Sequence, residues 1–181
     1  IAQNFVSGVI LMAEGVIKPG DVLEVDGHLV RVDRLGIRST VARTLFDEDL
    51  VIPNSLLVQG TVKNFTLGDR LYRLRVRVGV AYGSDMVQVE ETLRAVAEGI
   101  EFRERSREPR IQMMDFGASS VDWEVSLWID DPFNQRSRTA EVRKAIWFGL
   151  KAAGISIAFP QLDVHVDAEV VAALRGTPTR S

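Results

Sequence analysis

Three polar side chains near the end of the sequence have the types that metal chemistry uses. Asp163, His165 and Asp167 alternate along a stretch that we predict to be a strand, Leu162 to Val166, so they would share one face. Two carboxylates and an imidazole can bind a divalent metal, which makes a metal-dependent hydrolase one alternative. The spacing matches no established metal signature. A solvated strand face is therefore the preferred interpretation, and no metal is expected.

Other signatures of catalysis are missing from the sequence. His28 directly follows the predicted hairpin turn Asp26-Gly27, a position typical of an exposed structural residue. The absence of cysteine excludes thiol nucleophiles, thiolate metal sites and disulfides. Neither a Gly-rich phosphate loop nor a nucleophile elbow occurs. We expect a protein that is not an enzyme and holds no cofactor.

An arginine row raises the question of nucleic acid. Arg73, Arg75 and Arg77 would lie on one face of a strand predicted over Leu71 to Val80. RNA-recognition modules stack bases on aromatic residues at fixed places, and the predicted strands 71–80 and 111–116 lack that pattern. The formal net charge of −3 gives no general attraction to nucleic acid. No nucleic-acid partner is expected, and an RNA-binding module with Sm-like and ferredoxin-like domains remains the alternative.

The elements that would position these side chains begin with short strands. Residues 14–67 alternate with a period close to two, and Asp26-Gly27 is a strong hairpin signal. Gly36 lies inside a long strand-like stretch, Leu29 to Arg43, and indicates a bulge or a sharp bend. The remaining strands are predicted at 22–25, 50–52 and 61–65. Several short, bent strands predict a small Sm-like β-barrel or sandwich.

Residues 68–167 follow the order βαββαβ. Strands are predicted at 71–80, 111–116, 121–129 and 162–166, with helices at 86–98, capped by Ser84 or Asp85, and 137–153. This order is typical of the ferredoxin-like fold, a four-stranded antiparallel sheet with both helices on one face. The fold class is therefore α+β. Residues 168–181 form a C-terminal tail.

The first thirteen residues are an almost uncharged run that begins without an initiator methionine. A membrane span needs about 20 apolar residues, so this run is too short to be a complete one. It is either the end of a helix belonging to a larger protein or a buried amphipathic helix, and the run alone favours neither.

Short motifs in a fixed order connect the chain with a known family. They run from Ile1 to about Val166: Gln3-Asn4-Phe5 with Gly8, Ile17-Lys18-Pro19-Gly20-Asp21, Ile52-Pro53-Asn54-Ser55, Asn64-Phe65-Thr66, Gly79-Val80-Ala81-Tyr82-Gly83-Ser84-Asp85, Asp115-Phe116-Gly117, Ser119-Ser120-Val121, Asp130-Asp131-Pro132, and Phe159-Pro160-Gln161 with Asp163-Val164-His165. In this order the sequence resembles the mechanosensitive channels of small conductance.

The resemblance implies a function. It implies a homoheptamer whose β domains and ferredoxin-like domains form a water-filled vestibule on the cytoplasmic side of the inner membrane. Ions and small solutes would pass through side portals to a pore that opens under membrane tension in hypo-osmotic shock. The lipid-facing helices and the gate would lie upstream of Ile1, and residues 1–13 would be the end of the pore helix.

The resemblance also assigns roles to residues. Asn4 and Gly8 match positions associated with bending and inactivation of the pore helix, and Phe5 would help to seat that helix on the β domain. Pro19, Gly20 and Asp21 match the turn from the helix into the β domain. Alanine at Gly8 is expected to stiffen the helix and slow inactivation.

Overall fold

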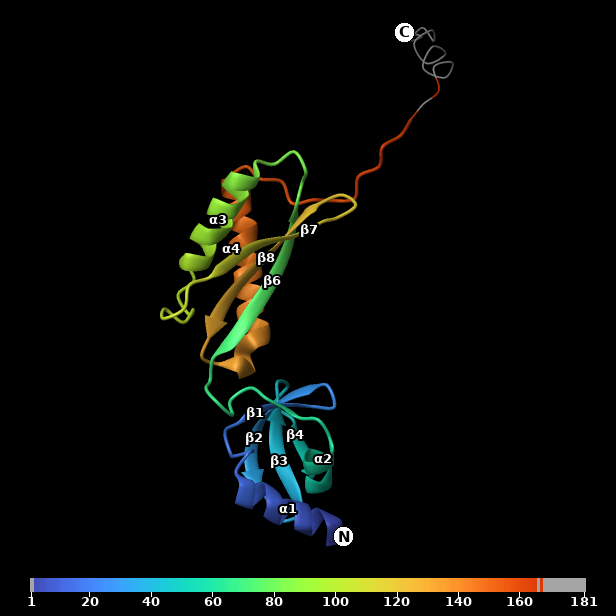
Figure 1. Ribbon diagram of the computed structural model, residues 1–181, viewed down its shortest axis with the longest axis vertical. Coiled ribbons are helices and arrows are strands. Elements are labelled where there is room, and N and C mark those ends of the chain that lie inside the picture. The colour runs from blue at the N-terminus through green and yellow to red at the C-terminus, as the bar shows by residue number, and fades with distance from the viewer. Residues whose placement is uncertain (1, 166, 168–181) are drawn as a thin grey trace.

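The computed structural model describes residues 2–165 and residue 167. It contains two antiparallel sheets, each with its own buried core, which confirms the α+β class (Figure 1). The first sheet lies beside the N-terminal helix, and the second carries two long helices. The predicted tail, 168–181, lies outside the described residues.

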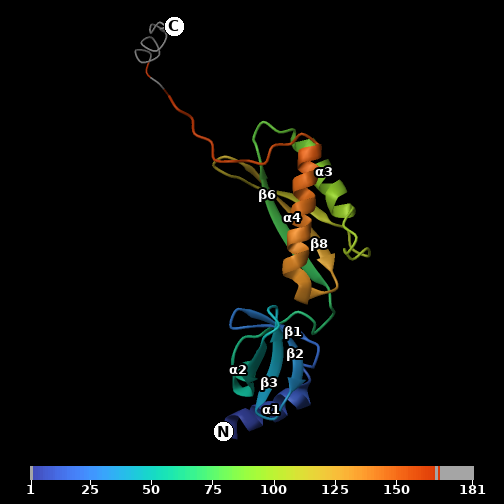
Figure 2. The ribbon, with the colours of Figure 1, turned by 180° about the vertical axis from the view of Figure 1, so that it is seen from behind.

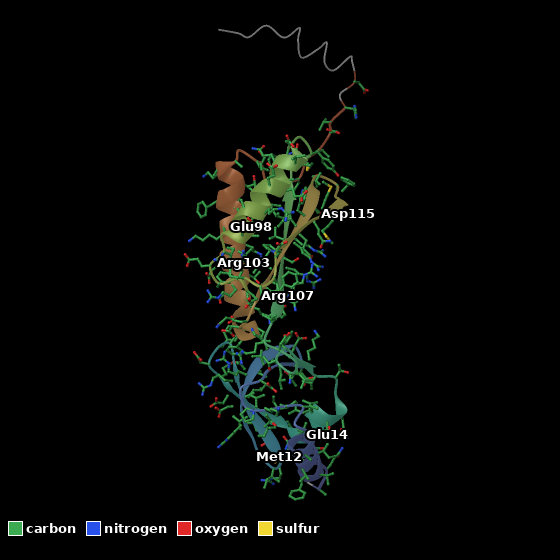
Figure 3. All side chains as sticks on the ribbon, turned by 60° about the vertical axis from the view of Figure 1, so that its left-hand side comes forward. Met12, Glu14, Glu98, Arg103, Arg107 and Asp115 are labelled. Atoms are coloured by element: carbon green, nitrogen blue, oxygen red, sulfur yellow. The ribbon has the colours of Figure 1, made fainter. Side chains whose placement is uncertain are left out.

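Helix α1, Ala2–Glu14, is built from the uncharged run and ends at Gly15. Gly15 has φ +64°, and its amide donates to the Leu11 carbonyl oxygen at 3.1 Å, which closes the last turn. Only Ser7, Gly8 and Leu11 are buried along the helix. Figure 3 labels Met12 and Glu14 near its end. No helix within residues 2–165 is long and apolar enough to cross a bilayer.

The first sheet has five strands in the order β4-β3-β2-β1-β5, all antiparallel. The predicted hairpin turn joins β1 to β2, with φ +48° at Asp26 and +78° at Gly27. The apolar side chains that alternate along the strands form one buried core with Leu11 of α1. The strands are β1 (Val22–Val25), β2 (His28–Leu35), β3 (Ser39–Thr44), β4 (Asp49–Pro53) and β5 (Lys63–Asn64).

Two predictions for this region need correction. The stretch 29–43 is two antiparallel strands rather than one, because the chain reverses where the Gly36 amide donates to the Ser39 carbonyl oxygen at 2.9 Å. A short helix, α2 (Asn54–Gln59), follows β4 and was missed. Pro53 indicates the end of a strand, but proline is equally compatible with the start of a helix, because the first turn leaves its amides unpaired.

The second sheet has three strands in the order β6-β8-β7, and its helices cover one face (Figures 1 and 2). Helix α3 begins where the Asp85 carboxylate accepts hydrogen bonds from the amides of Val87 and Gln88, so that Asp85 is the cap of the two predicted. Buried side chains of α3, α4 and the facing sides of β6 and β8 form the second core. The elements are β6 (Tyr72–Val80), α3 (Met86–Glu98), β7 (Arg110–Phe116), β8 (Val121–Ile129), the 3-10 turn η1 (Pro132–Asn134) and α4 (Gln135–Ala152).

The predicted fourth strand of this sheet is wrong for residues 162–165, which have no regular structure; Val166 lies outside the described residues. Among the described residues, a single bridge, Val80 with Ile157, extends the sheet beyond β6. Leu162 and Val164 are 85% and 70% exposed. Their alternation with polar residues matches a strand, but no core face of this chain receives them.

Truncation of Leu93, a buried leucine of α3, tests the assignment of the second core. Leu93 is fully buried between the helices and the sheet, so Leu93→Ala should lower the free energy of unfolding by about 2–5 kcal/mol. Urea unfolding measures this loss. Leu67→Ala is the control, because Leu67 is 59% exposed and its truncation should change stability by less than about 0.5 kcal/mol. Equal effects of the two substitutions would contradict this core assignment.

Candidate functional site at the junction of helix α1 and the first sheet

Gly8 lies at the closest approach of helix α1 to the first sheet. A Cβ atom at Gly8 would lie 2.6 Å from Asn54 Nδ2 and closer still to the backbone carbonyl oxygen of Ile37. Real Cβ atoms essentially never lie this close to such atoms. Gly8 is thus required here because the helix backbone rests directly on the loop between β2 and β3.

Asn54 is the buried polar side chain behind this contact. Its Nδ2 donates to the carbonyl oxygens of Gly36 at 2.9 Å and Ile37 at 3.1 Å, and its Oδ1 accepts from Thr40 Oγ1 at 2.9 Å. Both Asn54 and Thr40 are fully buried. Their hydrogen bonds fix the β2–β3 loop at the place where Gly8 packs, since a buried amide without partners is costly.

A second contact joins α1 to the short helix α2. The amide of Ser55 donates to Asn4 Oδ1 at 3.1 Å. Ser55 is in the first turn of α2, where backbone amides have no partner within the helix. The Asn4 side chain supplies that partner, so α1 is held at two points one turn apart: Asn4 on α2 and Gly8 on the β2–β3 loop.

The opposite side of α1 is apolar and exposed. Phe5, Val6, Val9 and Met12 are between 48% and 54% exposed, and Ile10 is 36% exposed. The residues that seat the helix in this structure are Ser7, Gly8 and Leu11. The role expected for Phe5 in seating the helix therefore stays a prediction.

The turn from α1 into the first sheet is fixed by a carboxylate. Gly20 has φ +89°, and its amide donates to the Val32 carbonyl oxygen at 2.7 Å. Asp21 Oδ1 accepts from Thr66 Oγ1 at 2.7 Å, and Oδ2 accepts from the Lys18 amide at 2.9 Å and Asn64 Nδ2 at 3.0 Å. Asp21 thus ties the turn that follows Pro19 to β5 and the segment after it.

The predicted site residues therefore fall at two ends of one junction. Asn4 and Gly8 lie together on α1 against α2 and the β2–β3 loop, whereas Gly20 and Asp21 lie beyond the end of α1. The sequence reasoning gave no role to Asn54, Thr40 or Ile37. The motif Ile52-Pro53-Asn54-Ser55 was the available signal, but its partners lie 14 to 18 residues away and only the fold brings them together.

The metal and catalytic alternatives find no support in the geometry. Asp163 and His165 lie in the segment without strand structure, so the prediction that they share a strand face is wrong. Within residues 2–165 and 167, no group of three or more His, Asp or Glu side chains is placed to hold a metal ion. His28 is exposed at the start of β2, opposite Val25, as expected for a structural residue.

Comparison with known proteins identifies the two sheets. The family description "Mechanosensitive ion channel, beta-domain" matches residues 1–67, and "Mechanosensitive ion channel MscS, C-terminal" matches residues 74–157. The chain belongs to the MscS family. Helix α1 and the first sheet are thus the MscS β domain with the end of the pore helix, and the second sheet with α3 and α4 is the MscS C-terminal domain.

The names of two sequence relatives also refer to the MscS family or to a mechanosensitive channel. The chain is 33% identical over 166 residues to an uncharacterized MscS family protein of Haemophilus influenzae and 34% identical over 170 residues to the mechanosensitive channel MscK of Escherichia coli. These matches cover 92% and 93% of this chain and 15% of each relative. The chain therefore spans about a seventh of the length of these two relatives.

Solved structures agree with the sequence matches. The closed state of Helicobacter pylori MscS matches with a TM-score of 0.82 and 26% identity, over 92% of this chain and 65% of that one. Arabidopsis thaliana MSL1 matches with a TM-score of 0.67 at 14% identity, over 88% of this chain and 59% of that one, and shows the fold alone. MscS proteins are channels and not enzymes, which confirms the expectation that this chain is not an enzyme.

Replacement of Gly8 tests the close packing of this junction. Gly8→Ala should lower the free energy of unfolding of the β domain by about 1–3 kcal/mol, because the added Cβ meets backbone that cannot move aside easily. The sign is informative, since Gly to Ala at an exposed helix position stabilises by about 1 kcal/mol. Denaturant unfolding measures it, with exposed Val9→Ala as the control. A stabilised Gly8→Ala variant would refute the packing argument.

Proposed function

We propose that this chain forms the cytoplasmic vestibule of a mechanosensitive channel that opens under membrane tension and releases ions and small solutes in hypo-osmotic shock. Membership of the MscS family supports this proposal. In it, seven copies form a ring on the cytoplasmic side of the inner membrane, and membrane-spanning helices outside these 181 residues carry the ring to the bilayer. The alternative of an RNA-binding module gains nothing from the family matches.

The observation that carries the proposal is the two-sided character of α1. One side is fixed to the β domain through Gly8 and the Asn4–Ser55 hydrogen bond. The other side exposes a run of large apolar side chains that a single chain leaves in water. Neighbouring copies of α1 and adjacent helices would cover this side, as in a helix that lines a pore.

A mechanical consequence follows for gating. Tension favours the state with the larger area in the membrane plane, so only energies that differ between closed and open states affect the equilibrium. Asn4 and Gly8 hold α1 in register with its β domain, and Pro19, Gly20 and Asp21 set the direction in which the chain leaves the helix. In this proposal, Asn4 and Gly8 resist bending of α1 away from the domain, and inactivation is the loss of that register. The slower inactivation expected of Gly8→Ala from a stiffer helix is then opposed by the weaker packing that the added Cβ causes.

Assembly into a ring requires contacts that close on themselves. A ring is built from heterologous interfaces, in which one patch of each copy meets a different patch of the next. The first sheet offers two edge strands, β4 and β5, with unpaired backbone groups. We propose that one of these edges contacts the neighbouring β domain.

Light scattering tests assembly of the 181-residue chain. The wild-type chain at high concentration should have a mass several times 20.1 kDa, and Val6→Glu with Val9→Glu should reduce it because charges replace exposed apolar side chains of α1. Gln3→Glu on the same helix serves as the control, because Gln3 is exposed and already polar. A strictly monomeric wild-type chain would count against self-assembly through this region.

Patch-clamp recording of the full-length protein tests channel function and the role of Asn4. Wild-type patches should carry a tension-activated current. Asn4→Ala should make that current decline several-fold faster under sustained tension, because it removes the acceptor of the Ser55 amide and loosens α1.

The matched control is Gln3→Ala, since Gln3 is an exposed neighbour on the same helix. No tension-activated current in the wild type would refute the proposed function. Equal inactivation of Asn4→Ala, Gln3→Ala and the wild type would remove Asn4 from the mechanism and leave the channel function standing.

A further inference from the structure

The second sheet has a charged face that its helices do not cover. Leu74 and Val76 of β6 and Val125 of β8 belong to the core beneath α3 and α4. Because side chains alternate along a strand, Arg73, Arg75 and Arg77 of β6 lie on the other face. The same face carries Glu124, Ser126 and Trp128 of β8, and Arg110 of β7, which is paired with Ser126.

Three arginines surround one tryptophan on this face. The Cζ atoms of Arg73, Arg110 and Arg107 lie 5.5, 5.6 and 5.8 Å from the centre of the Trp128 ring. We call these four residues the Trp128 cluster. Arg73 comes from one edge strand and Arg110 from the other, with Trp128 on the strand between them. The aromatic ring favours nearby cations, but it carries no net charge to balance three of them.

The loop after α3 places the third arginine. The Glu104 amide donates to the Trp128 carbonyl oxygen at 2.7 Å, which fastens the loop to the end of β8. Arg103 donates from Nε to the Glu98 carbonyl oxygen at 3.2 Å and from Nη1 to the Arg107 carbonyl oxygen at 3.3 Å. Figure 3 labels Glu98, Arg103 and Arg107 along this path. Arg107 is thereby held beside the sheet.

The acidic groups on this face only partly balance the arginines. Glu124, 5% exposed, lies 3.9 Å from Arg73 and 3.5 Å from Arg77. Hydrogen bonds from Ser106 and the charge of Arg107 lower the pKa of Glu104, so that carboxylate is ionised at neutral pH. Asp115 and Asp122 line a hollow near Gly79, toward the other end of β6. By the same alternation Asp122 lies on this face, with Asp115 opposite it on β7. Five arginines thus share the face with three carboxylates, of which only Glu124 is buried, while Glu104 lies at its margin.

Two further observations indicate a missing negative partner. Arg107 and Arg110 form no ion pair with any carboxylate in the described part of the chain. The buried Nε of Arg73 has no hydrogen-bond partner among those residues, although Nη2 donates to Ser126 Oγ at 2.9 Å. A buried donor without an acceptor is costly. The excess of arginine on this face is local, because the whole chain is acidic, with a net charge of −3.

From this arrangement we propose that the Trp128 cluster binds a small anionic solute bearing a phosphate or carboxylate group. Guanidinium groups donate in a planar fork that matches the oxygens of both groups, and charge-assisted hydrogen bonds of this kind are stronger than neutral ones. Arg107 and Arg110 supply unpaired charge, and Arg73 is held in place by Ser126 and Glu124. The site would bind anionic solutes on the C-terminal domain, a property beyond the proposed channel function and measurable without a membrane.

Tryptophan fluorescence of the 181-residue chain tests the proposal at constant ionic strength. Inorganic phosphate and glutamate are titrated separately, with chloride as the third anion. Phosphate should give a saturable change that Trp128→Phe abolishes, since Trp123 is buried on the other face and Trp147 is on α4. Saturation by glutamate would show that the site accepts a carboxylate, and saturation by phosphate would show that it accepts a phosphate. Either result supports the site.

Two double variants that remove the same charge distinguish a specific anion site from general electrostatic attraction of anions to the protein. Arg107→Gln with Arg110→Gln should weaken phosphate binding at least tenfold, while Arg143→Gln with Lys144→Gln on α4 removes the same charge and should leave it unchanged. All four side chains are exposed, so both variants should keep the wild-type melting temperature without phosphate. The proposal is overturned if neither phosphate nor glutamate saturates, if chloride gives the same response, or if both double variants bind alike. These outcomes do not depend on whether the full-length protein carries a tension-gated current, so the site and the proposed channel function are tested separately.

Discussion

The close approach of helix α1 to the β2–β3 loop is the constraint on which the junction depends. It exists because Gly8 has no Cβ and because Asn54 holds the carbonyl groups of Gly36 and Ile37 in place from behind. A helix of thirteen residues with only three buried residues, one of them a glycine, would otherwise be weakly attached. The Asn4–Ser55 hydrogen bond adds direction to this contact, since it joins the start of α1 to the start of α2.

At both ends of the β domain, the hydrogen bonds of one polar side chain fix the backbone. At one end Asn54 is a buried amide with three partners, and at the other Asp21 is a carboxylate that accepts from Thr66, Lys18 and Asn64. In both places one short polar side chain replaces several backbone partners that a regular strand would supply. The β domain therefore has fixed geometry where helix α1 meets it, which is what the proposed role of keeping the pore helix in register requires.

The β domain and the C-terminal domain also touch through one arginine. Arg31 of β2 lies 3.7 Å from Asp131 and 4.3 Å from the centre of the Phe133 ring in η1. Exposed pairs of this kind contribute about 1 kcal/mol or less. Most of the stability of each domain must then come from its own apolar core, so the C-terminal domain and its arginine face form a unit separate from the α1 junction.

Local sequence patterns were sufficient for much of this fold. The Asp26-Gly27 turn, the Asp85 cap of α3 and the alternation of β6 and β8 depend on neighbouring residues, and the structure agrees with each. The family motifs pointed to Asn4, Gly8 and Asp21 as a set, although their roles remain proposals. Tertiary structure alone decided three other features: the partners of Asn54, the gathering of Arg73, Arg107 and Arg110 around Trp128, and the absence of strand structure at 162–165. Each of these depends on contacts between distant segments, or on whether a core face exists to receive a strand, and no local period encodes either.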